Sequence, residues 1–143
     1  MNEKALKLLD AACEAYDLYA VAKDSKTFCN LSVQHVCGRM GYDKMKGMVA
    51  NQMVDFLKRS DEWQPIDMSV AQGLANQGCI VIAGKQEDPH GHVVIIRPGL
   101  EEISGKWGRK APKVAQVGGT SYIGKTLAWA FKEMPEMWVL EGG

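Results

Sequence analysis

Apolar residues in the first half of the chain recur at the spacing of an amphipathic helix. From residue 2 to about residue 22, Leu, Ala and Tyr return every three or four positions between Lys, Asp and Glu, and this period predicts a helix. Glycine and polar residues interrupt the pattern, which then resumes three times before residue 78. The further helices are predicted over residues 29–40, over residues 44–58 with Asp43 as cap, and over residues 68–77 with Asp67 as cap.

After residue 78 the pattern changes to short apolar runs between turn residues, which predicts strands. The runs are residues 79–83, 92–97, 113–117 and 137–140. Residues 60–65 and 100–111 are polar and are predicted to be loops, and residues 126–133 are weakly helical. Because helices come first and strands follow, without the alternation of a doubly wound fold, we expect an α+β fold. Its N-terminal helices should pack on a small antiparallel sheet.

The composition limits the classes of function. The chain has 143 residues, of which 46% are hydrophobic and 24% charged, as expected for one globular domain spanning residues 1–143. Seventeen basic residues balance seventeen acidic ones, so charge gives no reason to expect nucleic acid or an anionic membrane as a partner. No apolar run approaches the roughly 18 residues of a membrane span. The N-terminus lacks the apolar centre of a signal peptide, so we expect synthesis in the cytoplasm without a cleaved leader.

The cysteines supply the first candidate for chemistry. Cys13, Cys29, Cys37 and Cys79 have spacings that match no zinc site, and the sequence requires no metal or organic cofactor. Three of them have apolar neighbours and are predicted to be small core residues. Cys29 instead follows a polar stretch and begins a predicted helix, where the positive end of the helix dipole favours a thiolate.

A histidine later in the chain can serve as the base for this thiol. His92 follows a glycine and opens a predicted strand. If the helix of Cys29 packs on that strand, the pair suits amide hydrolysis by a cysteine nucleophile. The imidazole then needs a polar partner, and Gln116 is the best-placed one because it is isolated in the apolar run at 113–117. On residue types alone, structural roles for Cys29 and His92 are the more common outcome.

Four segments, in order, resemble the NlpC-type and CHAP-type cysteine peptidases and amidases of peptidoglycan. The stretch TFCNLSV at residues 27–33 is similar to their nucleophile segment, and GHVVII at residues 91–96 is similar to their Gly-His strand. Residues 74–83 resemble the helix end and strand that precede the histidine. Residues 112–119 resemble the strand that carries the third polar residue.

This resemblance implies a papain-like fold in which Cys29 is the nucleophile, His92 the base and Gln116 the residue that orients the base. The implied substrate is a peptidoglycan peptide or muropeptide, cleaved at an amide bond by an endopeptidase or amidase. The implied place of action is the periplasm or the cell wall. With no leader, this requires delivery by a phage lysis system, by a contact-dependent secretion apparatus or by cell lysis.

The chain departs from the family pattern at two positions. Phe28 stands where many NlpC-type members have Asp, and Gln116 stands where the third residue is usually His, Asn, Asp or Glu. These departures keep open a non-catalytic binding or adaptor domain on the same scaffold. The longer stretch at residues 100–111, with Trp107, is either a substrate-facing insertion or a plain surface loop.

A second motif points to nucleotide binding. Residues 119–126 match the phosphate-binding pattern G-x-x-x-x-G-K-[ST], with Lys125 at the lysine position. Such loops open a parallel sheet and need further strands downstream, whereas only a short stretch follows Thr126. We therefore expect a glycine turn here, with nucleotide binding as the less favoured alternative.

Overall fold

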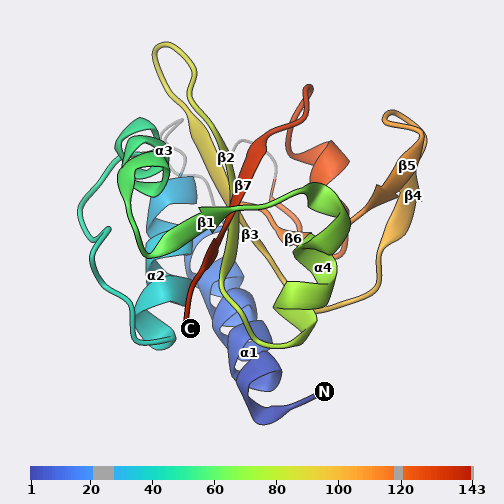
Figure 1. The fold of residues 1–143 in the computed structure, drawn as a ribbon, viewed down its shortest axis with the longest axis horizontal. Coiled ribbons are helices and arrows are strands. Elements are labelled where there is room, and N and C mark those ends of the chain that lie inside the picture. The colour runs from blue at the N-terminus through green and yellow to red at the C-terminus, as the bar shows by residue number, and fades with distance from the viewer. Residues whose placement is uncertain (21–27, 118–120, 143) are drawn as a thin grey trace.

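The computed structural model describes residues 1–20, 28–117 and 121–142. In this part of the chain, helices cover both faces of a five-stranded sheet, and a small two-stranded hairpin stands beside it (Figure 1). The helices are α1 (Glu3–Tyr19), α2 (Cys29–Arg39), α3 (Ala50–Arg59) and α4 (Met68–Asn76), with a 3-10 turn η1 (Leu127–Trp129). The strands are β1 (Trp63–Pro65), β2 (Val81–Lys85), β3 (His92–Ile96), β4 (Glu102–Ser104), β5 (Arg109–Ala111), β6 (Val114–Ala115) and β7 (Glu136–Leu140).

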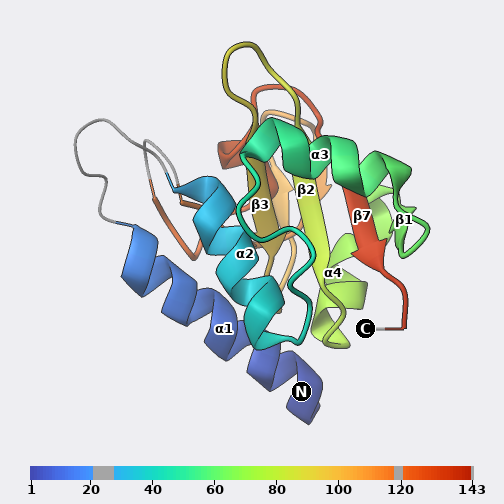
Figure 2. The same ribbon diagram turned by 90° about the vertical axis from the view of Figure 1, so that its left-hand side faces the viewer.

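The sheet has the order β1-β7-β2-β3-β6, and every neighbouring pair is antiparallel. Figure 2 shows α2 and α3 over one face of the sheet, with α4 behind it. Because both faces are covered, the central strands are apolar on both sides, and every residue from Ile80 to Ala83 and from Val93 to Ile96 is buried. The predicted α+β class with an antiparallel sheet is confirmed.

Local sequence explains where the predicted helices begin. The Asn2 side chain accepts a hydrogen bond of 2.7 Å from the backbone N–H of Ala5, which caps α1. Asp67 caps α4 by accepting a bond of 2.9 Å from the backbone N–H of Ser69, as predicted. The helix predicted over residues 44–58 is wrong in its first turns, because Gly47 adopts a φ of +84° and the helix begins only at Ala50.

Two predicted loops contain strands. Residues 63–65 of the predicted loop at 60–65 pair with β7, and the polar stretch at 100–111 forms the β4–β5 hairpin. Both were missed because their strands are three residues long and carry polar side chains. Trp63 is 2% exposed, and its indole N–H donates to the hydroxyl of Tyr42. Trp129, in η1, is 68% exposed.

The four cysteines differ in how deeply their side chains are buried, and the sequence predicted these differences only in part. Cys37 is buried, as expected for a small core residue, and this burial raises the pKa of its thiol to about 12. Cys13 is exposed and Cys79 is only partly buried, so the prediction of a core position is wrong for Cys13. Among the described helices, none is both long enough and apolar enough to cross a membrane.

Candidate active site

Cys29 is the first residue of α2, and its sulfur lies against strand β3. The side chain is 5% exposed. Backbone N–H groups of Val93, Asn30 and Cys29 itself hydrogen-bond to the thiol. The bond from Val93 places the sulfur beside the residue that follows His92. Two of the three donors are first-turn amides, which have no acceptor within the helix.

Burial governs the charge of this thiol. Desolvation raises the pKa of Cys29 above its ordinary value, and the three backbone hydrogen bonds oppose this shift without cancelling it. The thiol is therefore protonated at neutral pH. The expectation that the helix dipole would favour a thiolate is wrong for the free protein, because burial costs the anion more than the helix terminus stabilises it.

His92 bonds to Gln116 through a short contact between ring and amide. The Nε2 atom of His92 lies 2.6 Å from Oε1 of Gln116. The amide oxygen only accepts hydrogen bonds, so Nε2 carries the proton and Nδ1 keeps a free lone pair. Sequence reasoning placed Gln116 opposite His92, and the structure brings these two side chains together.

Strand register explains this pairing. In the β3–β6 pair Ile95 faces Ala115, and one step further along the strands Val94 faces Gln116. His92 is then the diagonal neighbour of Gln116 on the same face of the sheet. The backbone of Gln116 is fixed by two hydrogen bonds with Tyr122, of 2.8 and 3.0 Å, so its amide is presented from a stable position.

The imidazole is neutral in this environment. Burial lowers the pKa of His92, whereas the bond to Gln116 and the charge of Glu87 raise it by less. The ring of Phe131 packs on the imidazole, with a centroid separation of 5.2 Å. This contact was not foreseen, because Phe131 lies far along the chain and its sequence context signals only a core residue. A neutral imidazole with a free Nδ1 can accept a proton from a thiol.

A cleft of about 400 Å³ opens beside Cys29. It is lined by the first residues of α2 and α3 and by the loop that leads into His92. The lining residues are Phe28, Cys29, Asn30, Leu31, Val49, Ala50, Asn51, Pro89, His90 and Gly91. None of these described residues is Lys, Arg, Asp or Glu, so the cleft is uncharged apart from any charge on the exposed His90.

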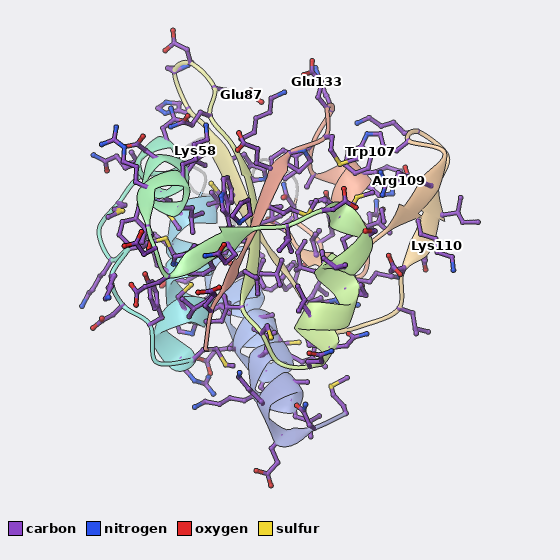
Figure 3. The ribbon with its side chains drawn as sticks, in the orientation of Figure 1. Lys58, Glu87, Trp107, Arg109, Lys110 and Glu133 are labelled. Carbon is purple, nitrogen blue, oxygen red and sulfur yellow. The ribbon has the colours of Figure 1, made fainter. Side chains whose placement is uncertain are left out.

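Asn51 joins α3 to the loop on the far side of this cleft. Its side chain donates to the carbonyl of Glu87 at 2.9 Å and accepts from the N–H of Glu87 at 3.2 Å. Glu87 lies in the loop that connects β2 to β3 (Figure 3). A Cβ at Gly91 would lie 2.1 Å from Oδ1 of Asn51 and 2.8 Å from the carbonyl of Lys85. Position 91, before His92, therefore requires glycine because α3 and the end of β2 approach the backbone closely at this point.

The remaining candidate ligands stand apart from this arrangement. His35 pairs with Glu14 at 2.5 Å on the outside of α1 and α2. Within the described residues, no three His, Cys, Asp or Glu side chains are grouped so that they could hold a metal ion.

The phosphate-loop pattern does not have the surroundings of a nucleotide site. Gly119 and Thr120 lie outside the described residues, as do residues 21–27, which include the polar stretch before Cys29. In the described part, the Lys125 ammonium lies over the ring of Trp129, 4.2 Å from its centroid. The strand before the motif, β6, pairs antiparallel with β3, whereas a phosphate loop opens a parallel sheet.

Comparison with known proteins does not assign the chain to a family. No protein-family model matches it, and no curated protein matches its sequence. The resemblance to the NlpC-type and CHAP-type enzymes stays a prediction from four short segments.

Proposed function

We propose that this chain is a papain-like cysteine hydrolase that cleaves amide bonds in bacterial cell-wall peptidoglycan. The observation that carries the proposal is the bond between His92 and Gln116 at 2.6 Å. The thiol at the head of α2 takes a hydrogen bond from Val93, the residue that follows His92. A nucleophile, a base and an orienting amide thus come from three separate segments of the chain. The peptidoglycan substrate rests on the ordered resemblance of the segments around these residues.

The protonation states favour a general-base mechanism. His92 Nδ1 takes the thiol proton of Cys29 while the sulfur attacks the amide carbonyl, so no thiolate needs to exist beforehand. The backbone N–H of Cys29 donates to the developing oxyanion. The imidazolium returns the proton to the departing amine, which leaves a thioester. Water then attacks the thioester with His92 again as base, releasing the acid and restoring the thiol.

Gln116 keeps the ring in the productive tautomer. Its amide oxygen holds the proton on Nε2, so Nδ1 remains the acceptor throughout the cycle. An amide stabilises the imidazolium less than a carboxylate would, because it carries no negative charge. The cleft beside Cys29 suits a short uncharged part of the substrate, such as an alanine of a wall peptide, since its described lining carries no Asp, Glu, Lys or Arg.

Digestion of purified sacculi tests this function. The wild type should release new amines or soluble muropeptides, and Cys29→Ala should reduce the rate by at least about a thousandfold, as expected when a nucleophile is removed. Cys79→Ser is the matched control, because Cys79 is a partly buried thiol outside the cleft lining, and it should retain activity. Equal release by the wild type and Cys29→Ala would rule the proposal out.

A second candidate is a non-catalytic binding domain on the same scaffold. The specific observation in its favour is the burial of Cys29, at 5% exposure with a raised pKa, which is also typical of an inert structural cysteine. This candidate predicts that muropeptides bind equally well to the wild type and to Cys29→Ala in calorimetry and are recovered intact from both. Cleavage that requires Cys29 would exclude it.

A further inference from the structure

The ring that covers His92 belongs to a segment with little regular structure. Phe131 is 5% exposed, and its ring lies against the imidazole at 5.2 Å between centroids, with the two ring planes tilted by 51°. It follows the three-residue turn η1 and precedes β7. A segment of this kind has few hydrogen bonds of its own, so its position depends on what other elements hold it.

The hairpin β4–β5 provides such a hold. The ammonium of Lys106, in the hairpin turn, donates to the carbonyl of Phe131 at 2.6 Å and to that of Ala128 at 3.3 Å. Figure 3 shows Trp107 on the side of the hairpin that faces η1, and Lys110 pointing away from it. The Lys106 ammonium thus joins the hairpin to the backbone at Ala128 and at Phe131, on either side of the short segment between them.

The hairpin is itself anchored to the body of the protein. At its base, Lys113 donates to the carboxylate of Glu102 at 2.7 Å, and the backbone N–H of Lys113 donates to Gln72 in α4 at 2.8 Å. In the turn, Gly108 adopts a φ of +66° and its N–H bonds to the carbonyl of Ser104 at 2.8 Å. The Lys106 ammonium is therefore held by a structured hairpin and not by a loose loop.

We propose that Lys106 is a positioning residue, which fixes Phe131 over His92 from the β4–β5 hairpin. Gln116 then orients the imidazole through Nε2, and the ring of Phe131 packs against it. The significance for catalysis rests on the proposed hydrolase function, but the positioning itself does not. The stretch at residues 100–111 thereby acquires a role in the site, in place of a plain surface loop.

Other charged groups around the imidazole must be kept constant in a test. Glu87 acts on His92 from the β2–β3 loop. Lys85 is the register partner of His92 in β2 and pairs with Glu133 at 2.9 Å. Lys106 lies on none of these elements, so its replacement alters the cover of the ring without removing a charge that acts directly on it.

A pH titration of His92 by nuclear magnetic resonance of labelled imidazole tests the proposal. Lys106→Met should release Phe131, expose the ring and raise the titration midpoint of His92 toward the ordinary value of about 6.5. Lys106→Arg, which keeps a cationic donor, and Lys110→Met, which changes an exposed lysine of the same hairpin, should both titrate as the wild type. Lys106→Gln is a second variant, which removes the charge but keeps a polar side chain. It should shift the midpoint in the same direction as Lys106→Met.

Two outcomes separate this proposal from the proposed function. An unshifted His92 titration in both Lys106→Met and Lys106→Gln would overturn the positioning role, whether or not the protein cleaves peptidoglycan. A shifted titration would support it even in a protein without hydrolase activity. If the wild type is active, Lys106→Met should also lower kcat by about tenfold or more with little change in KM, because the base is misplaced.

Discussion

The protonation of Cys29 and His92 is decided by burial at the scale of the single residue. A thiol at the head of α2 has three N–H donors, yet its pKa is raised, because removal from water outweighs them. The same effect lowers the pKa of His92. Both groups are therefore uncharged at neutral pH. The site differs in this respect from one that rests on a preformed thiolate and imidazolium.

His92 makes the stability of the protein depend on pH in a defined window. Its pKa is lower in the folded state, so the unfolded chain takes up a proton first as the pH falls below about 6.5. The free energy of unfolding should therefore fall from pH 6.5 to 5, with a slope from this one group of at most about 1.4 kcal/mol per pH unit. Above pH 6.5 the group adds no slope.

Urea denaturation of the wild type and of His92→Gln across this range measures the effect. The variant should show a smaller slope between pH 6.5 and 5, whatever its absolute stability. His35→Gln is the matched control, because His35 lies outside the site beside Glu14. Identical slopes for the wild type and His92→Gln would contradict a lowered pKa for His92.

Candidate residues could be predicted from the sequence where their signal was local. Gly91 and His92 open an apolar strand, Cys29 opens a helix, and Gln116 is the polar residue of an apolar run. The contact of Phe131 with His92 could not be predicted, because it depends on a turn far along the chain and on the tether from Lys106. The charge state of Cys29 was predicted wrongly, because the sequence shows a helix start but not the depth of burial.

At the scale of elements, the close packing of the β2–β3 loop against α3 explains a glycine in the site. Gly91 leaves no room for a side chain, since an added Cβ would meet the Asn51 amide and the carbonyl of Lys85. Gly91→Ala should therefore displace the loop and lower the free energy of unfolding by about 1–3 kcal/mol, as for other overpacked positions. Chemical denaturation measures this change.

Gly73→Ala is the control for that substitution. Gly73 lies within α4, and a Cβ there would meet no atom within 4 Å. The alanine should leave stability unchanged or raise it by up to about 1 kcal/mol, because alanine favours the helix. If Gly91→Ala proved as stable as Gly73→Ala, the loop would not be held closely against Asn51.

Elements with a long, regular pattern were the ones that the sequence predicted well. Helices α1, α2 and α4 and strands β2, β3 and β7 lie where apolar spacing placed them, within a few residues. The start of α3 was misplaced because the apolar pattern continues through Gly47, which adopts a φ of +84°. Strand β1 and the β4–β5 hairpin form through pairing with distant or polar partners, and no local period reveals them.

At the scale of the whole molecule, the antiparallel sheet brings His92 and Gln116 together and places the head of α2 beside Val93 of β3. Strand β3 lies between β2 and β6, so His92 has Gln116 on one neighbouring segment, while α2 packs across it with Cys29 (Figure 2). The order of elements along the chain predicted that the helix of Cys29 packs on the sheet, whereas the meeting of the Cys29 thiol with the His92 imidazole stays a prediction. The segment after η1 and the β4–β5 hairpin lie on the other side of the molecule from α2 (Figure 1). Their packing beside His92 arises only in the tertiary structure, so no local sequence pattern predicts it.

The proposed mechanism requires that His92 activates the buried thiol of Cys29. Treatment with an alanine-based peptidyl vinyl sulfone, followed by mass spectrometry of the intact protein and its tryptic peptides, tests this claim directly. We expect one adduct, on Cys29, which is lost in His92→Ala, while the exposed Cys13 stays unmodified at the same dose. Modification of Cys13 in preference to Cys29, or modification of Cys29 that is unchanged in His92→Ala, would contradict it.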